Sequence, residues 1–435
     1  MKKVLIVADL FHSSPRIPGI SLNMLKFGWE PTIITRPIKD DPKNLLAFPK
    51  GFLEKVRIIE TDYDGDVFIF WRNLLVRLGF KNKKSILNQV KEKTGAKSKK
   101  TFIDFIFKLY LTFFAYPDIE KKWENQAIKA AVYIMEKEKF RMILSSSSPV
   151  TCHVICSKLK KKFKVPWVAD FRDLWTQNHD YNYFWPRKIF EKKLEIEILK
   201  EADALVTVSD PFKTNLSKLH IGKPVYAITN GFNLEEMNNS SADLTDKFTI
   251  TYAGNIYIGK QDPKDLFIAL KDFISENLVD PEDIEIRFFT GAIPWLEKEI
   301  SDYEFEKFAK VYEKKSRNEI FEKQNESQLL LVIYWADKKE RGWQSLKIFG
   351  YLASQRPILV INGSGDDVVK EMIEKTKSGT YCEDINDLKK SLKVFYDDYK
   401  KNGKVTYEGN MEEIKKHSYL EKAKKFAVIF DKIAV

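Results

Sequence analysis

The strongest candidate for chemistry in the first half of the sequence is a group of charged residues that directly follows an apolar run. Residues 167–169 have the composition of a buried strand, and Asp170, Arg172 and Asp173 come at its end. Ligands of parallel α/β sheets bind beyond the carboxyl ends of the strands. These three residues are therefore candidate catalytic residues, and an Asp–Arg clamp that only holds two loops together is the alternative.

A run of four serines and a proline lies just before this group, at 145–149. It follows one expected strand and opens a helix expected over 150–163. The serines are expected to cap this helix, and Pro149 suits its first turn. The N-terminus of a helix offers backbone N–H groups to an anion, so the sequence predicts a phosphate contact at this turn.

The second half of the sequence contains a glycine and two lysines that suit a diphosphate. An expected strand at 249–252 runs into Gly254, where the backbone and its N–H group can approach a phosphate closely. Lys260 follows as a mobile positive charge. Lys347 opens a helical segment that leads into another strand, and it is expected to reach the same diphosphate.

The elements that would position these residues follow a regular alternation. Short β-branched apolar runs alternate with helix-length stretches, which is typical of parallel sheets with helices on both faces. The alternation stops at a polar stretch over 233–246 and then restarts. The sequence thus predicts an α/β fold with two doubly wound domains, over 1–234 and 235–410, and one active site in the cleft between them. Residues 411–435 are expected to form a C-terminal helix that packs back on the N-terminal domain.

Composition limits the class of protein and its partners. The 435 residues are 44% hydrophobic, which excludes low-complexity disorder and collagen-like architectures. The net charge of +11 favours polyanionic partners, namely nucleic acid, anionic lipid or phosphorylated substrates. Because no nucleic-acid recognition pattern accompanies the basic stretches, we expect no nucleic-acid partner. Three cysteines and the lack of a long uninterrupted apolar run favour a cytoplasmic protein without a disulfide scaffold or a metal site.

One segment predicts contact with a membrane. Lys81–Lys100 contains eight lysines and one acid, Glu92, and it runs into the aromatic stretch Phe102–Tyr116. Lysines followed by an amphipathic aromatic helix suit the surface of an anionic bilayer. The alternative is a solvated lysine-rich loop that leads into a helix buried in the first domain.

Taken in their order along the chain, these features resemble the retaining glycosyltransferases of the two-Rossmann-domain (GT-B) class, family four. The resemblance covers nearly the whole chain. It rests on the loop at 14–20, the serine run, the stretch from Asp170 to Asp173, the strand that ends at Gly254, and the block at 347–353.

The resemblance implies a role for individual positions. Lys260 would neutralise the leaving diphosphate of a nucleotide-sugar, and Arg172 stands where a number of relatives have an active-site histidine. The donor-binding residues implied by position are Gly19, Gly254, Asn255, Lys260, Lys347, Gly350 and Tyr351.

Three of these positions depart from the family pattern. Asn255 stands where many relatives have an arginine, and Gly350 and Gly342 stand where relatives have glutamates. The glutamate usual at 350 grips the ribose hydroxyls of the donor. Gln344 and Ser345 are the candidate local substitutes for it.

The function implied is transfer of a sugar from a nucleotide diphosphate donor to a hydroxyl of a surface glycan or lipid-linked acceptor, with retention of configuration. Such reactions build polysaccharide, O-antigen or capsule-type glycans. The resemblance implies no metal and no cofactor, and a location in the cytoplasm or on the cytoplasmic face of the membrane. Two alternatives remain open: a sugar-nucleotide epimerase of the same fold, and a catalytically impaired binding subunit.

Overall fold

A computed structural model gives the architecture of the chain. It describes residues 1–10, 14–38, 48–63, 65, 109, 112–113, 115–178, 181, 183, 185–238, 243–334, 342–365 and 367–434. The lysine-rich segment Lys81–Lys100 and most of Phe102–Tyr116 lie outside these residues, so their predicted membrane contact stays a prediction.

The first half of the chain forms a seven-stranded sheet in which all strands are parallel, in the order β3-β2-β1-β4-β5-β6-β7. Its central strands are buried along nearly their whole length, as expected for apolar runs covered by helices on both faces. The strands are β1 (Lys2–Ala8), β2 (Trp29–Thr35), β3 (Arg57–Glu60), β4 (Met142–Ser147), β5 (Trp167–Phe171), β6 (Ala204–Thr207) and β7 (Val225–Ala227).

The second half repeats this plan with a six-stranded parallel sheet, in the order β10-β9-β8-β11-β12-β13. In both sheets the strand order reverses beside the first strand of the unit, between β1 and β4 and between β8 and β11. Such switch points open a crevice at the carboxyl ends of the strands. The strands are β8 (Phe248–Ala253), β9 (Ile284–Phe289), β10 (Ala309–Tyr312), β11 (Leu329–Ile333), β12 (Ile358–Ile361) and β13 (Gly379–Tyr381).

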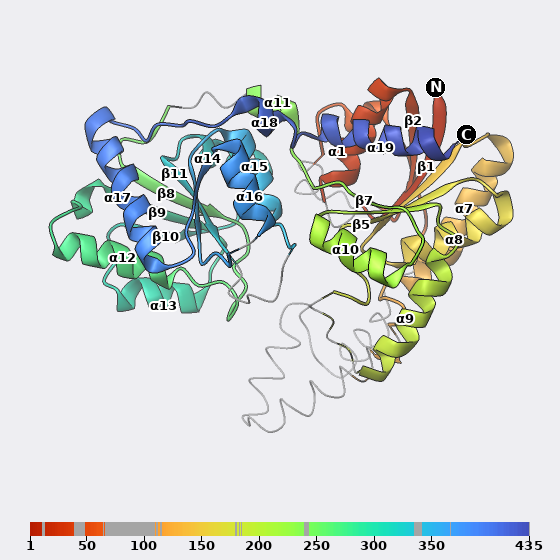
Figure 1. Ribbon diagram of the computed structural model, residues 1–435, viewed down its shortest axis with the longest axis horizontal. Helices are drawn as coiled ribbons and strands as arrows, with labels where there is room; N and C mark the ends of the chain where they lie inside the picture. Colours follow the sequence, from red (N-terminus) through yellow and green to blue (C-terminus); the bar gives the residue numbers. More distant parts are fainter. Residues whose placement is uncertain are drawn as a thin grey trace.

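Helices cover both sheets, and the two units lie side by side (Figure 1). In the first unit they are α1 (Arg16–Met24), α3 (Phe52–Lys55), α7 (Glu124–Lys137), α8 (Thr151–Phe163), α9 (Trp185–Leu199) and α10 (Asp210–Leu219). In the second they are α11 (Leu234–Asn238), α12 (Lys264–Ser275), α13 (Pro294–Asp302), α14 (Arg317–Asn325), α15 (Leu346–Ser354), α16 (Val368–Thr376), α17 (Ile385–Asn402) and α18 (Met411–Lys415). The predicted fold class, two tandem doubly wound α/β units, is confirmed.

The last helix, α19 (Tyr419–Ile433), returns to the first unit and lies beside α1 (Figure 1). The contact is close at Gly19 of α1, where an added Cβ would stand 2.3 Å from the ring of Tyr419. The N–H of Gly19 donates to the carbonyl of Pro15 at 2.9 Å. Gly19 therefore serves the packing of two helices, and its N–H group is not free to bind the phosphate of a donor.

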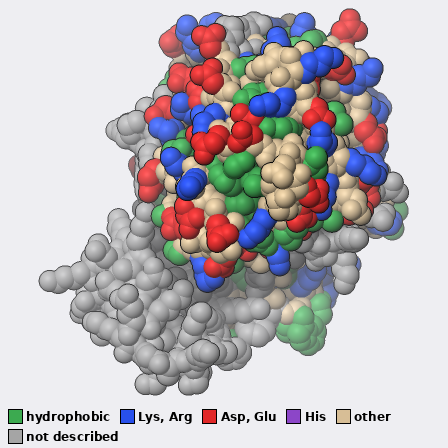
Figure 2. Space-filling view, turned by 90° about the vertical axis from the view of Figure 1, so that its left-hand side faces the viewer, with side chains coloured by type: hydrophobic (Ala, Val, Ile, Leu, Met, Phe, Trp, Pro, Cys, Tyr) green, Lys and Arg blue, Asp and Glu red, His purple; other side chains and the backbone are tan. Residues whose placement is uncertain are grey.

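The surface of the second unit carries both signs of charge. Lys and Arg side chains alternate with Asp and Glu side chains over the face shown in Figure 2. The net charge of +11 is thus not gathered into one basic field on this face. Among the described helices, none combines the length and the hydropathy that crossing a membrane requires.

Candidate active site

A cavity of about 610 Å³ lies between the two units, where the carboxyl ends of both sheets meet. Its lining residues come from segments that follow strands and from the start of a helix. From the first unit, Arg172 and Asp173 follow β5; from the second, Gly254 and Asn255 follow β8, and Lys347 opens α15. The structure thus brings five of the predicted site residues together.

Arg172 is held in the cavity wall by main-chain groups. Its Nε donates to the carbonyl of Ser147 at 2.8 Å, and an Nη donates to the carbonyl of Ser148. A guanidinium has five N–H donors. Within the described residues, Arg172 forms no ion pair, so its charge is not neutralised there.

Asp170 lies behind this wall rather than in it. Its carboxylate is fully buried and forms a bidentate ion pair with Arg16, at 2.7 and 3.0 Å, and it accepts a third hydrogen bond from Ser146 at 2.9 Å. Arg16 also donates to the carbonyl of Thr229 at 2.8 Å. The geometry of Asp170 is therefore that of a structural Asp–Arg clamp, the alternative to a catalytic role. Its partner is Arg16, which the sequence analysis assigned only to the loop after the first strand.

Lys347 brings a second cation to the cavity from the opposite unit. Its chain packs against Gly254, where an added Cβ would stand 2.5 Å from Lys347 Cε. Its ammonium lies 4.9 Å from the ring centre of Tyr252 and donates to the carbonyl of Asn255 at 3.2 Å. Burial lowers the pKa of Lys347 to about 8, and within the described residues no carboxylate is paired with it.

Gly254 makes room for this lysine instead of offering its own N–H group. That N–H donates to the carbonyl of Phe289 at 3.1 Å, so it is not available to a phosphate as the sequence suggested. With φ at +119°, the position also suits glycine better than any residue with a side chain.

Asn255 holds a further lysine that sequence reasoning missed. Lys314, between β10 and α14, donates to Asn255 Oδ1 at 2.6 Å. The family resemblance implies an arginine at this position; here Asn255 holds a cation from another loop at the rim of the cavity. No local motif marks Lys314, because its partner lies 59 positions away along the chain.

Gly350, Tyr351 and Lys260 are not among the described residues that line the cavity. Tyr351 is fully buried, and its hydroxyl accepts a hydrogen bond from the N–H of Ala253 at 3.1 Å, so it supports the end of β8. A Cβ added at Gly350 would meet only Gln324 Oε1, at 3.8 Å. Lys260 lies in the turn after β8, beyond Tyr257, whose carbonyl accepts its N–H at 3.0 Å.

Gly342 has a steric reason to depart from the family pattern. Its φ is +95°, and an added Cβ would stand 2.8 Å from Pro211 Cβ and 2.9 Å from Ser209 Oγ. Pro211 belongs to α10 of the first unit, so the two units touch at this glycine. A side chain at this position would force Pro211 or Ser209 to shift.

The serine run does not cap a helix. Residues 145–147 belong to β4, and α8 begins only at Thr151. Asp118 occupies the start of that helix: its carboxylate accepts from the N–H of Thr151 at 2.7 Å and from the Thr151 hydroxyl at 2.8 Å. The predicted phosphate contact at this turn is therefore wrong, because a carboxylate of the chain already fills it.

Two buried amides complete the cavity wall. Asn230, which follows β7, is 6% exposed, and Gln344, just before α15, is 8% exposed; both line the cavity. Asn230 Oδ1 and Gln344 Oε1 have no hydrogen-bond partner in the part of the chain that the structure describes. A buried polar oxygen without a partner costs free energy, so both positions favour a ligand that brings hydroxyl donors.

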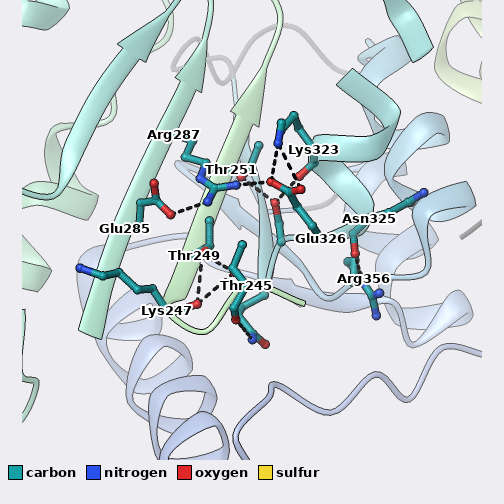
Figure 3. Close-up of polar contacts among 12 residues, drawn as sticks. Thr245, Lys247, Thr249, Thr251, Glu285, Arg287, Lys323, Asn325, Glu326 and Arg356 are labelled. Atoms are coloured by element: carbon teal, nitrogen blue, oxygen red, sulfur yellow. Dashed lines mark hydrogen bonds and ion pairs between the residues drawn. The ribbon is translucent and has the colours of Figure 1, made fainter. Parts of the chain in front are cut away.

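A second charged cluster lies away from the cavity, beside β8, β9 and the end of α14 (Figure 3). Arg287 of β9 pairs with Glu285 and with Glu326, each at 2.5 Å, and Lys323 pairs with Glu326 at 3.0 Å. Arg287 and Lys323 thus each have a carboxylate partner. Within the described residues, no group of three His, Cys, Asp or Glu side chains is placed to hold a metal ion.

Comparisons with known proteins agree with this geometry. Residues 107–236 match the sequence profile of Glycosyltransferase Family 4. A comparison with curated protein sequences finds no significant match.

Solved structures match over almost the whole chain. Sucrose-phosphate synthase from Thermosynechococcus elongatus is 11% identical, with 99% of each chain covered and a TM-score of 0.61. Anabaena HepE, solved in complex with UDP, is 10% identical, with 99% of this chain and 100% of that chain covered and a TM-score of 0.60. UDP-GlcNAc 2-epimerase from Neisseria meningitidis, bound to UDP-GlcNAc, is 12% identical, with 99% and 100% covered and a TM-score of 0.51. The predicted GT-B fold is thus confirmed over nearly the whole chain, and the sequence similarity to Glycosyltransferase Family 4 covers residues 107–236.

Proposed function

We propose that the protein is a retaining glycosyltransferase that moves a sugar from a nucleoside diphosphate donor to a hydroxyl of a glycan or lipid-linked acceptor. One observation carries the proposal: two cations from opposite units, Arg172 and Lys347, face one cavity without a carboxylate partner among the described residues. A diphosphate is the anion that such a pair suits.

The residues of this chain would act mainly by electrostatics. The acceptor oxygen attacks the anomeric carbon, the bond from that carbon to the diphosphate oxygen breaks, and the acceptor proton passes to the leaving diphosphate. Lys347, with Lys314 beside Asn255, would stabilise the negative charge that develops on the leaving group. Arg172 would orient the donor and the acceptor.

Lys260 enters the proposal as a residue that acts when the units close over the donor. It lies in the turn that continues the wall formed by Gly254 and Asn255. Closure would also exclude water and limit hydrolysis of the donor. On this view a Lys260→Ala variant loses turnover, whereas a Lys347→Ala variant also loses affinity for the donor.

The orphaned amide oxygens support a hydroxyl-rich ligand. Gln344 lies close in sequence to the two glycines at positions where the resemblance implies glutamates, Gly342 and Gly350. We propose that Gln344 and Asn230 accept hydrogen bonds from hydroxyl groups of the nucleotide-sugar in place of a carboxylate.

A donor screen followed by product analysis tests the proposal. Thermal shift against a panel of nucleoside diphosphate sugars should identify a stabilising donor, and mass spectrometry should then find the acceptor heavier by one sugar residue. Lack of binding at millimolar donor would favour a non-enzymatic binding subunit and contradict the proposal.

The epimerase is the second candidate, because a UDP-GlcNAc 2-epimerase shares the fold. The two reactions differ in their need for an acceptor. A change of donor configuration in the absence of any acceptor would identify an epimerase, whereas acceptor-dependent release of nucleoside diphosphate would identify a transferase.

The finer parts of the proposal concern place and pathway. We propose a role in polysaccharide, O-antigen or capsule-type synthesis at the cytoplasmic face of a membrane, with Lys81–Lys100 and Phe102–Tyr116 at the bilayer surface. Flotation with liposomes tests the segment directly: Lys→Glu changes across 91–100 should reduce binding to anionic vesicles.

A further inference from the structure

Helix α9 presents an unusual set of side chains to the solvent. Trp185 is 74% exposed and Phe190 is 62% exposed, and Ile189 lies next to Phe190 with 48% exposed. Exposed apolar residues are ordinary when they are scattered singly. Here they lie within six consecutive positions at the start of one helix, and Trp185 and Ile189, four positions apart, lie on the same side of it.

Two of the three acidic residues of α9, Glu191 and Glu195, point the other way, into the protein. Glu191 pairs with Arg187 at 2.6 Å and accepts from the hydroxyl of Tyr181 at 2.5 Å. Glu195 is fully buried and accepts from the N–H of Thr176 at 3.1 Å. These interactions fix which side of the helix faces the protein, because turning α9 would bury lysines and expose the two glutamates.

The outward side carries positive charge. Lys188, Lys192 and Lys193 are exposed, and none of them forms an ion pair within the described residues. The one exposed acid of the helix, Glu197, lies 3.9 Å from Lys200 and is balanced by it. The α9 surface, defined as Trp185, Lys188, Ile189, Phe190, Lys192 and Lys193, is therefore both apolar and cationic.

This surface continues into the end of the stretch for which the sequence predicts a membrane contact. The carbonyl of Phe190 accepts from the hydroxyl of Tyr116 at 3.4 Å, and Arg187 donates to the carbonyl of Ala115 at 2.6 Å. Phe113, two residues before Ala115, is 71% exposed. The described part of that stretch and the start of α9 thus lie side by side.

We propose that the α9 surface docks on a membrane that contains anionic lipids. Tryptophan and phenylalanine suit the boundary between headgroups and acyl chains, and lysines beside them suit the phosphates of anionic lipids. Lysine side chains reach the headgroups while their methylene chains lie along apolar surface. The apolar and the cationic side chains lie on the same part of the helix. A bilayer surface can contact both at once, because its acyl chains and its headgroup phosphates are adjacent. Docking there would hold the first unit, the expected acceptor side, at the lipid surface.

Flotation with vesicles of phosphatidylcholine, with and without phosphatidylglycerol, tests the proposal on the full chain. Two variants are needed, Lys188→Glu/Lys192→Glu/Lys193→Glu and Trp185→Ser/Phe190→Ser. We expect the charge variant to lose at least about tenfold in partition to anionic vesicles, because each lysine near such a surface contributes roughly fivefold. We expect the apolar variant to lose binding that high salt does not already remove.

Matched controls lie on the second unit, which Figure 1 shows far from α9. Lys390, Lys401 and Lys404 are also exposed and form no ion pair within the described residues, and Val394 of α17 is 66% exposed. Far from the proposed interface, the variant Lys390→Glu/Lys401→Glu/Lys404→Glu makes the same change of net charge as the α9 charge variant. The variant Val394→Ser removes an exposed apolar side chain there. They should float as the unchanged protein does.

Three results would overturn the proposal. The first is vesicle binding that survives both α9 variants while Lys→Glu changes across 91–100 abolish it. The second is an equal loss in the control variants, which would indicate a response to net charge alone. The third is no binding to anionic vesicles together with binding of the α9 surface to an acidic protein or a nucleic acid. Unchanged melting temperatures and unchanged donor binding in the α9 variants exclude a folding defect.

Discussion

The two charged regions of this molecule differ in how their cations are compensated. In the cluster beside β8 and β9, Arg287 contacts two carboxylates at 2.5 Å each (Figure 3). In the cavity, the hydrogen bonds of Arg172 and Lys347 within the described residues go to backbone carbonyls, and neither cation has a carboxylate partner there. The pKa shifts follow this difference: the acids beside Arg287 raise its pKa, whereas burial lowers that of Lys347 to about 8.

The difference indicates two uses of charge. A cation that is paired with carboxylates contributes to the stability of the folded protein without any ligand. Its removal leaves those carboxylates without a partner. An uncompensated, half-buried cation costs free energy until an anion arrives, so its contribution appears when a ligand binds. The cavity and the Arg287 cluster should therefore respond in opposite ways to substitution.

The largest effect is expected at Lys347. A Lys347→Ala variant should lose about 10²–10³-fold in kcat/KM, because it removes a charge that would neutralise the leaving diphosphate. Its melting temperature should stay the same or rise, since a desolvated charge disappears. Initial rates and a thermal melt of the same preparation measure both. Lys347→Arg, which keeps the charge, is the control and should retain more activity than the alanine variant.

The reverse result is expected at Arg287. An Arg287→Leu variant should lower the free energy of unfolding by about 2 kcal/mol, because Glu285 and Glu326 would face each other without their common partner. Donor binding well below the melting temperature should stay unchanged. Calorimetry and donor titration check the two halves. A loss of donor affinity without a loss of stability would break the distinction between the two regions.

The fold could be predicted from the sequence because its signals are local. Apolar runs such as those of β1 and β8 alternate with helical stretches, and a parallel doubly wound sheet follows from that alternation. The cleft followed as well, because the carboxyl ends of such sheets are where ligands bind. Arg172 and Asp173 were placed by this rule, and both line the cavity.

The remaining site residues depend on contacts between distant segments, which spacing does not encode. Asp170 lies within β5, two positions before Arg172, yet its carboxylate pairs with Arg16, 154 positions away. The family resemblance implied that Gly19 binds the donor, but Gly19 packs against Tyr419 of the last helix instead. Lys314 was missed for the same reason, since only the folded chain brings it to Asn255.

A smaller effect is expected at Lys314, whose cation lies at the rim of the cavity. Lys314→Ala should weaken donor binding about tenfold if Lys314 stands in for the arginine of many relatives, since a hydrogen bond to a charged group contributes about 1.5–3 kcal/mol. Asn255→Ala should show a similar loss, because it releases Lys314 from its position. Calorimetric titration with the donor measures both. The double variant tests the coupling: a loss equal to the sum of the two single losses would mean that Asn255 does not act through Lys314.

The smallest effect is a dependence on pH that also separates the two regions. With the pKa of Lys347 lowered to about 8, the free protein loses this charge as pH rises through that value. Donor affinity should therefore fall roughly twofold by about pH 8 and several-fold by about pH 9. Stability should move the other way: the unfolded chain keeps the Lys347 proton up to the usual pKa of 10.5, so raising the pH from about 8 toward that value favours the folded state. Lys347→Met should flatten both trends, while Arg287→Leu should leave them in place, because the arginine stays charged throughout. Parallel trends of affinity and stability in the unchanged protein would mean that another group governs the cavity.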